Sequence, residues 1–191
     1  MELNVKTFGE WLSDWKEYIT NSELPAWESI PDLGLYMEQV VTYLRDVIGL
    51  SHVGHDGTEI VTASAINNYV RKKLMPAPVK KRYYRVHLAY LLVLCTLKQS
   101  LTISEICKLF PRGVEDEELR TFYSAFAVQH AQAAKYFTRR LEHDGNLVLK
   151  SDPGDSPYDR TSQFILDMAI ISSFAKLISE KLIDYKSKEN Q

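Results

Sequence analysis

The sequence predicts an all-α fold with a short β wing, and three observations lead to this prediction. Apolar residues recur at helical spacing through most of the 191 residues. One basic and aromatic stretch, VKKRYYRV at 79–86, has strand-like composition. The most apolar run, Leu88–Leu97, is about half the roughly 20 residues that a membrane-spanning helix needs. We therefore expect this run to be a buried core helix in a protein of ordinary globular composition.

Two amphipathic helices and a proline-bounded connector are predicted in the first part of the chain. Apolar residues recur every three or four positions over 7–20 and again over 35–50, which indicates one helix in each segment. The connector PAWESIPDLG, at 25–34, separates them. The segment SHVGHDGTEIV, at 51–61, then breaks the helical period with Gly54 and Gly57, and it predicts a turn or a short hairpin.

A third helix is predicted from a cap at Thr62 or Ser64 to about Leu74, with Pro76 and Pro78 closing it. On a helical wheel one face is apolar and the opposite face is polar. The apolar face holds Ile66, Val70 and Leu74, and the polar face holds Ser64, Asn67, Asn68, Arg71 and Lys72. The stretch VKKRYYRV then supplies the wing. A capping box, Thr102 with Glu105, opens a short helix to Phe110.

Two long helices are predicted in the last part of the chain. Acidic residues at 115–118 favour a helix start, and Gly145 is expected to end that helix. The loop KSDPGDSP leads to a last helix with Ser156 as its cap and Pro157 in its first turn. Its apolar residues follow a four-three spacing typical of coiled coils, with Ile165, Ile170, Phe174 and Leu177 off that seam. Because apolar residues cover so much of this helix, we expect one side to be buried within the chain and a second side to be buried between subunits. The alternative is that the helix packs wholly within one chain. We divide the chain into 1–34, 35–112 and 113–191.

Charge is distributed unevenly along the chain. No Asp or Glu occurs from Ile60 to Ser104, and eight Lys or Arg give this stretch a charge of +8. Since the whole chain carries -2, the remainder carries -10. Such a field attracts a polyanion to one face and repels it elsewhere. An ordinary solvated surface is the alternative, but 45 residues without a counter-charge argue against it.

The chemistry of the third helix and the wing suits nucleic acid. Asparagine can bond to adenine through two hydrogen bonds, and arginine can bind guanine or phosphate. Lysine, arginine and tyrosine side chains on a wing can reach phosphate oxygens. Only one of Tyr83 and Tyr84 is expected to make such a contact, because the other is expected to pack beneath the wing. The residues that we expect at DNA are Ser64, Asn67, Asn68, Tyr69, Arg71, Lys72, Lys80, Lys81, Arg82, Tyr83 and Arg85.

Several segments carry a resemblance to known families. LPAWESIPDLGLYMEQVVTYL, INNYV, PAPVKK and HLAYLLVLCTLK are similar to a bacterial family, domain-of-unknown-function family 1836, over about Leu24–Phe110. The order of recognition helix, proline-marked turn, basic wing, apolar helix and capped helix resembles the DNA-binding unit of MerR-type regulators. The resemblance implies a MerR-like winged helix-turn-helix over 35–112, followed by a helical dimerisation or effector region.

The chain departs from the MerR pattern in three places. In the recognition helix of MerR regulators the pattern is an apolar residue followed by Arg, Tyr and Tyr. This pattern falls on residues 66–69 of the chain, where only the last aromatic residue, Tyr69, is retained. The wing pattern Arg-x-Tyr falls on 81–83, or on 82–84 if the register differs by one. The segment 51–61 is also longer than the three or four residues of an ordinary helix-turn-helix turn. The helical core could therefore be arranged differently from that of MerR.

Enzymatic function is the minority interpretation. The sequence has no glycine-rich phosphate loop, Gly-x-Ser-x-Gly elbow or His-Glu-x-x-His motif, so no cofactor and no catalytic residue are predicted. His52, His55, Asp56 and Glu59 could be imagined around a metal ion, but a second ligand pair of known spacing is missing, and we predict no metal site. Cys95 and Cys107 lie in apolar segments without a Cys-x-x-Cys pair, which favours a reducing, cytoplasmic location.

These observations together predict a cytoplasmic transcriptional regulator that binds double-stranded DNA as a homodimer through its C-terminal helices. The alternative is a helical adaptor whose basic face docks an acidic protein partner. An anionic membrane surface is a weaker candidate, because the basic helix has no exposed Trp, Phe or Leu face to insert.

Overall fold

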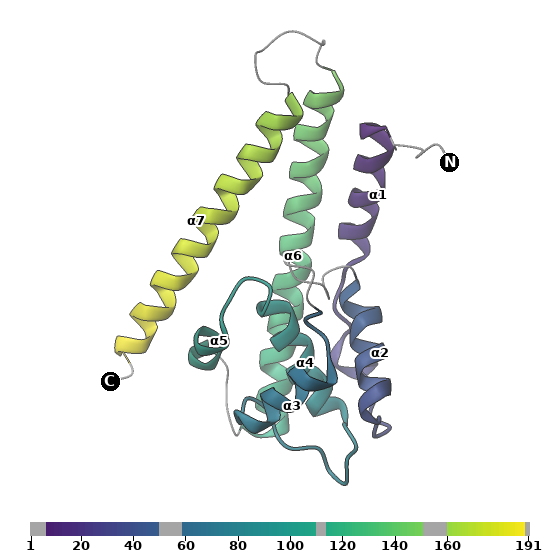
Figure 1. Ribbon diagram of the computed structural model, residues 1–191, viewed down its shortest axis with the longest axis vertical. Helices are drawn as coiled ribbons and strands as arrows, with labels where there is room; N and C mark the ends of the chain where they lie inside the picture. The colour runs from purple at the N-terminus through teal and green to yellow at the C-terminus, as the bar shows by residue number, and fades with distance from the viewer. Residues whose placement is uncertain (1–6, 50–58, 110–113, 151–159, 190–191) are drawn as a thin grey trace. The chain divides into compact units, whose positions relative to one another are not determined.

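The computed structural model describes residues 7–49, 59–109, 114–150 and 160–189. These residues form seven α-helices and one 3-10 turn (Figure 1). The elements are α1 (Phe8–Asn21), η1 (Trp27–Ser29), α2 (Met37–Ile48), α3 (Ala63–Arg71), α4 (Arg85–Leu97), α5 (Ile103–Leu109), α6 (Asp116–Leu149) and α7 (Arg160–Glu189). The mainly helical prediction is confirmed for the described part of the chain.

The predicted β wing is wrong in its detail. Where the chain is described it has no named strand, and the expected wing contributes only two isolated bridges, Val79 with Arg82 and Leu35 with Tyr83. Leu35 and Tyr83 each donate a backbone N–H to the other's carbonyl at 2.8 Å. Because Leu35 is held in this bridge, it does not begin the second helix as predicted, and α2 begins at Met37.

The chain divides into two compact units by packing. We call Met1–Ser22 with Ala131–Ser179 unit 1, and Glu23–His130 with Glu180–Gln191 unit 2. Helix α6 belongs to both units, because one boundary between them falls between His130 and Ala131.

The core of unit 2 is built around α4. Nine consecutive residues of this helix, from His87 to Cys95, are buried, which confirms the prediction of a core helix. Helix α2 packs against both α3 and α4. Tyr123 from α6 is also buried, and its hydroxyl donates to the Pro25 carbonyl at 2.8 Å. A helix that is apolar on every side can be stable only when it is surrounded in this way.

Threonine side chains cap three of the described helix starts, and two of these caps, at α3 and α5, were predicted. The Thr7 hydroxyl accepts from the Glu10 N–H at 3.3 Å, and the Glu10 carboxylate accepts from the Thr7 N–H at 2.8 Å. Thr102 and Glu105 form the same reciprocal pair at the start of α5. Of the two candidates for the third helix, Thr62 is the cap, because its hydroxyl accepts from the Ala65 N–H at 3.1 Å.

Gly145 does not end the sixth helix, contrary to the prediction, and α6 continues to Leu149. The reason is a close approach of α1 within unit 1. A Cβ atom at position 145 would lie 2.6 Å from both Cδ atoms of Leu12. The glycine therefore makes room for Leu12 rather than supplying a left-handed helix end.

Helix α7 is the one helix in the described residues that is long and apolar enough, by length and composition, to cross a membrane, although no residue of its most apolar window is buried. The predicted cap Ser156 and Pro157 lie outside the described residues. The predicted four-three seam comprises Phe164, Met168, Ile171, Ala175, Ile178, Leu182 and Tyr185. Of its members in unit 1, the first three are half-buried, whereas Ala175 and Ile178 are exposed.

Candidate nucleic-acid interface

Helix α3 separates a buried side from an exposed polar side. Ile66 and Tyr69 are the buried residues of the helix, and Leu74 just beyond it is buried too. The polar residues expected at DNA lie on the other side. Ser64, Asn67, Arg71 and Lys72 are exposed and Asn68 is half-buried. The amphipathic pattern therefore turns the predicted recognition face toward solvent.

Four of these polar residues line one open hollow of about 830 Å³. The hollow is bounded by Thr62, Ser64, Ala65, Asn67, Asn68 and Arg71, all from α3 and its cap. Within it, the Arg71 guanidinium donates to the Asn68 side-chain oxygen at 2.9 Å. This bond fixes the Asn68 amide and leaves the other Arg71 N–H groups free to bind an acceptor.

The end of α3 places Lys73 in an unusual backbone conformation. The Leu74 N–H donates to the Tyr69 carbonyl at 3.0 Å, and the Lys73 N–H donates to the Val70 carbonyl at 2.9 Å. This pair of bonds is the Schellman arrangement, in which the residue after the helix is usually glycine. Here that residue is Lys73, with φ at 55°.

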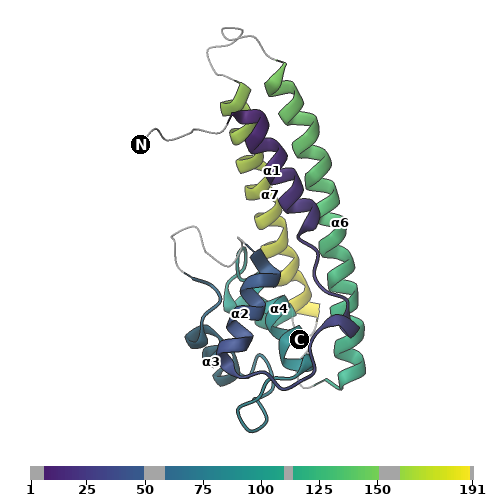
Figure 2. The same cartoon turned by 90° about the vertical axis from the view of Figure 1, so that its right-hand side faces the viewer.

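The same conformation recurs in the segment between α3 and α4, which loops out from the end of unit 2 where α3 lies (Figures 1 and 2). Val79 and Arg82 exchange backbone hydrogen bonds of 3.1 and 2.9 Å. The two residues between them, Lys80 and Lys81, have φ of 50° and 64°. Positive φ at both central positions defines a type I′ turn, which ordinarily holds Asn-Gly or Gly-Gly.

Lysines thus occupy every non-glycine position with positive φ in the described residues. A residue with a Cβ atom costs about 1–2 kcal/mol more than glycine in this left-handed region of backbone conformation. The three lysines are exposed, and none of them forms an ion pair with a described residue. Their charge is therefore not neutralised by an ion pair within the described part of unit 2. We define the basic surface as Ser64, Asn67, Asn68, Arg71, Lys72, Lys73, Lys80 and Lys81.

Two tyrosines expected at DNA are in the core instead. Tyr69 is 2% exposed and Tyr83 is 3% exposed, so neither side chain can reach a phosphate. Burial also raises the pKa of both phenols. The helical wheel placed Val70 on the apolar face and overlooked Tyr69, which follows Ile66 by three residues. Of the tyrosine pair, Tyr83 is the one that packs, and Tyr84 is half-buried.

Arg82 and Arg85, which were expected to bind phosphate, hold the connector before α2. The Arg82 guanidinium donates to the Gly34 carbonyl at 3.1 Å and to the Tyr36 hydroxyl at 2.8 Å, and it lies 4.5 Å from the centre of the Tyr36 ring. The Arg85 Nε donates to the Ile30 carbonyl at 3.0 Å. Sequence spacing could not reveal these contacts, because they join residues about 50 positions apart. Both arginines therefore leave the set of proposed contacts.

His87 fastens the turn to the core helix. Its Nδ1 accepts from the Tyr84 N–H at 3.0 Å, and its Nε2 lies 3.1 Å from the Ala77 carbonyl oxygen. A backbone N–H can only donate and a carbonyl can only accept, so the ring is in the tautomer with its proton on Nε2. The basic turn is thereby attached to a rigid element.

The residues considered for metal binding are only partly described. His52, His55 and Asp56 lie outside the described residues, and Glu59 forms an ion pair with Arg45. Over the described ranges no group of three or more His, Cys, Asp or Glu could hold a metal ion. Cys95 is buried in α4, and burial raises the pKa of its thiol to about 12. A thiol of this kind is a poor nucleophile.

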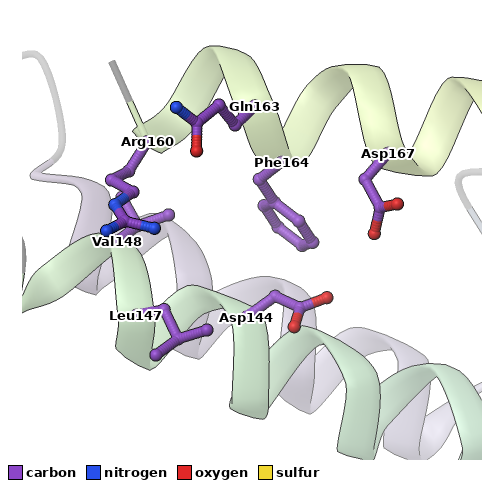
Figure 3. A pocket seen from close by; sticks show the side chains of 7 residues that line it. All are labelled: Asp144, Leu147, Val148, Arg160, Gln163, Phe164 and Asp167. Carbon is purple, nitrogen blue, oxygen red and sulfur yellow. The ribbon is translucent and has the colours of Figure 1, made fainter. Parts of the chain in front are cut away.

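A second, smaller hollow of about 190 Å³ lies in unit 1 (Figure 3). Figure 3 shows Phe164 and Asp167 of α7 directed toward Asp144 and Leu147 of α6. Arg140 forms ion pairs with both Asp144 and Asp167. The pKa of Asp144 is lowered, since hydrogen bonds from His143 and Arg140 outweigh its desolvation. Both carboxylates thus have a structural role: Asp144 pairs with Arg140 within α6, and Asp167 pairs with Arg140 to connect α7 to α6.

Comparisons with known proteins give one match. The family model described as "Domain of unknown function (DUF1836)" matches residues 25–126, which cover all of the basic surface. No curated protein and no solved structure matches the chain.

Proposed function

We propose that this chain, which belongs to the DUF1836 family, binds double-stranded DNA through its basic surface and regulates transcription. The observation that carries the proposal is the backbone at Lys73, Lys80 and Lys81. Each position would accommodate glycine with less strain, yet each holds a cation without an ion-pair partner among the described residues. Strained backbone is found where the strained residue has a function, and the function available to three free cations is to bind an anion.

The partner that fits best is a polyanion whose base edges are accessible to hydrogen bonds, as in double-stranded DNA. Five cations of the basic surface, Arg71 with the four lysines at 72, 73, 80 and 81, can neutralise phosphates. Asn67 and Asn68 on α3 supply the amide groups that pair with adenine in the major groove. Backbone contacts from the turn would set the position of α3 on the duplex, and the amides would then read the sequence.

The resemblance to the MerR DNA-binding unit is part of this proposal. It is supported by the order of α3, the proline-marked turn, the apolar α4 and the capped α5. A type I′ turn with two lysines at its tip takes the place that a wing has in that unit. In this proposal the Lys80–Lys81 turn contacts the sugar-phosphate backbone beside the groove that α3 enters.

The experiment is a fluorescence-anisotropy titration of the full chain with duplex DNA, using random genomic fragments and the fragment upstream of its own gene. Replacing Asn67 and Asn68 with Ala is expected to remove the preference for the upstream fragment, by about 1–3 kcal/mol for each lost base contact. Replacing Arg71 and Lys72 with Ala is expected to weaken binding to both fragments alike. Lys135→Ala removes an exposed cation of unit 1 and serves as the matched control.

The outcomes separate the proposal from the adaptor alternative. No binding to either fragment at 50 mM salt would contradict the DNA proposal. If the basic surface instead bound an acidic protein, the charge variants would abolish that binding while the Asn67 and Asn68 variants left it intact. Binding that was lost equally in Lys135→Ala would show that net charge alone, and not this surface, determines affinity.

A further inference from the structure

Unit 1 lacks the apolar core that unit 2 has. Among its described residues, Leu12 is the one hydrophobic side chain that is buried, whereas eleven large hydrophobic side chains are exposed. Six of the exposed side chains lie on α7 between Ile165 and Ile178. Soluble monomers rarely expose apolar patches larger than a few hundred Å². The side chains of this unit therefore need a partner surface.

We propose that a second copy of this chain covers the exposed side of α7 in unit 1, so that two α7 helices pair across a two-fold axis. We call this side the α7 apolar face: Leu166, Ile170, Phe174 and Leu177, with the exposed Ile165 and Ile178 at its borders. This inference goes beyond DNA binding and does not depend on it.

The α7 apolar face is distinct from the side that packs within the chain. Phe164, Met168 and Ile171 are half-buried and lie on the stripe that includes Asp167, the ion-pair partner of Arg140 on α6. Figure 3 shows Phe164 and Asp167 on the side of α7 that is directed toward α6. Leu166, Ile170, Phe174 and Leu177 follow a separate stripe at four-four-three spacing. Their exposed fractions run from 47% to 62%. A helix with two apolar stripes can pack on its own chain and on a partner at the same time.

The area of the face suits a dimer. A large apolar side chain that is half exposed presents roughly 100 Å². Four such side chains present about 400 Å² on one protomer, and a symmetric pair would bury about 800 Å². Burial of the bordering Ile165 and Ile178 would raise this to about 1,200 Å², the lower end of the range for specific interfaces, before any contribution from α6.

The charge pattern favours a second copy over a different protein. Between Thr161 and Ser179, α7 has only two charged residues, Asp167 and Lys176, and Asp167 is paired with Arg140. A nearly neutral apolar face offers no charge pattern for choosing another protein. It is complementary to itself, as an interface on a two-fold axis must be.

The same charges argue against a lipid bilayer as the occupant. Although α7 has the length and composition of a membrane span, it is tied to α6 by Arg140. Helix α6 has six acidic or basic residues from Lys135 to Asp144. Ionised groups are costly within a bilayer, so the two helices could not enter it together.

The test measures the mass of the full chain in solution, without DNA, by sedimentation velocity from 1 to 50 μM. The wild-type chain is expected to have twice the monomer mass. The double variant Ile170→Glu with Phe174→Glu is expected to have the monomer mass and an unchanged helical circular dichroism spectrum. Ser172→Glu introduces the same charge at an exposed position away from the stripe, and it is expected to remain dimeric.

Three results would overturn the inference. One is a wild-type monomer at 50 μM, and another is a dimer that persists in the Ile170 and Phe174 double variant. The third is flotation of the wild-type chain with phosphatidylcholine and phosphatidylglycerol vesicles, abolished in the same double variant, which would assign the face to a bilayer. Because DNA is not in the assay, none of these results bears on the proposed DNA binding.

Discussion

Replacing the three left-handed lysines with glycine should stabilise the protein and weaken its binding to DNA at the same time. The changes are Lys73→Gly, Lys80→Gly and Lys81→Gly, at positions with φ of 55°, 50° and 64°. Relief of the left-handed conformation contributes about 1–2 kcal/mol at each position. The greater freedom of glycine in the unfolded chain offsets about 0.5–1 kcal/mol of it. We expect a net gain of about 0.5–1 kcal/mol for each substitution.

The two effects have separate magnitudes and separate assays. Three substitutions should raise the free energy of unfolding by roughly 1.5–3 kcal/mol, measured by urea denaturation, if they act independently. Each phosphate contact contributes a slope of about 0.9 in log affinity against log salt. If all three lysines contact phosphate, the triple variant should bind about 10²–10³-fold more weakly at 0.1 M salt, with a slope smaller by about 2.7.

Lys72→Gly provides the matched control. Lys72 neighbours Lys73 and is equally exposed, but its φ is -81°, so glycine relieves no strain there. This variant should lose affinity without gaining stability. If the triple variant were less stable than the wild type, the strain argument would be wrong. Should it be more stable yet bind DNA with an unchanged salt slope, the lysines would not be phosphate contacts.

Three further predictions concern the folded chain. Gly145→Ala should lower the free energy of unfolding by up to about 2 kcal/mol, because overpacking against the Leu12 Cδ atoms at 2.6 Å outweighs a gain of about 1 kcal/mol in helix propensity, and the loss should be smaller in a Leu12→Ala background. Burial lowers the pKa of His130, so its contribution to stability is complete above about pH 6.5 and is lost as the pH falls toward its folded value. The free energy of unfolding, measured by urea denaturation, should change less between pH 7.5 and 5.5 in His130→Leu than in the wild type. An equal change in the two proteins would refute this. Finally, Cys107 should react with a thiol reagent at pH 8 in the native protein while Cys95 reacts only after denaturation, and equal native rates would contradict the burial of Cys95.

Local sequence signals predicted the helices well where a local contact defines the helix end. Thr62 and Thr102, both predicted as caps, accept hydrogen bonds from residues three positions ahead, and such a local contact is visible in the sequence itself. The long apolar run of α4 likewise predicts burial without knowledge of its neighbours. Helices α3, α4 and α5 all belong to unit 2.

The errors arise where a distant residue determines the local structure. A glycine after a long helical period is typical of a helix end. Gly145 lies inside α6 instead, where the missing side chain leaves room for Leu12 of α1. Leu35 fits the apolar period of α2, yet it pairs with Tyr83, 48 positions later, instead. A period of 3.6 residues describes one helix and contains no information about which segment lies beside it.

The sequence predicted the positive charge of the candidate site, but the structure changed which residues belong to it. The absence of acidic residues over 60–104 predicted where the basic surface would be. Composition alone could not distinguish Arg82, which holds the connector, from Lys80 and Lys81, which are free in the turn. Lys73 was not among the expected contacts, since its exposure follows from the Schellman geometry at the end of α3.

The most direct test of the account is the salt dependence of wild-type binding to duplex DNA, measured by fluorescence anisotropy between 50 and 200 mM salt. Five free cations on the basic surface predict a slope of log affinity against log salt of about -4.5 when all five contact phosphate. A slope between about -3 and -5 would support DNA binding through this surface. A slope near zero, or no binding at 50 mM salt, would contradict it.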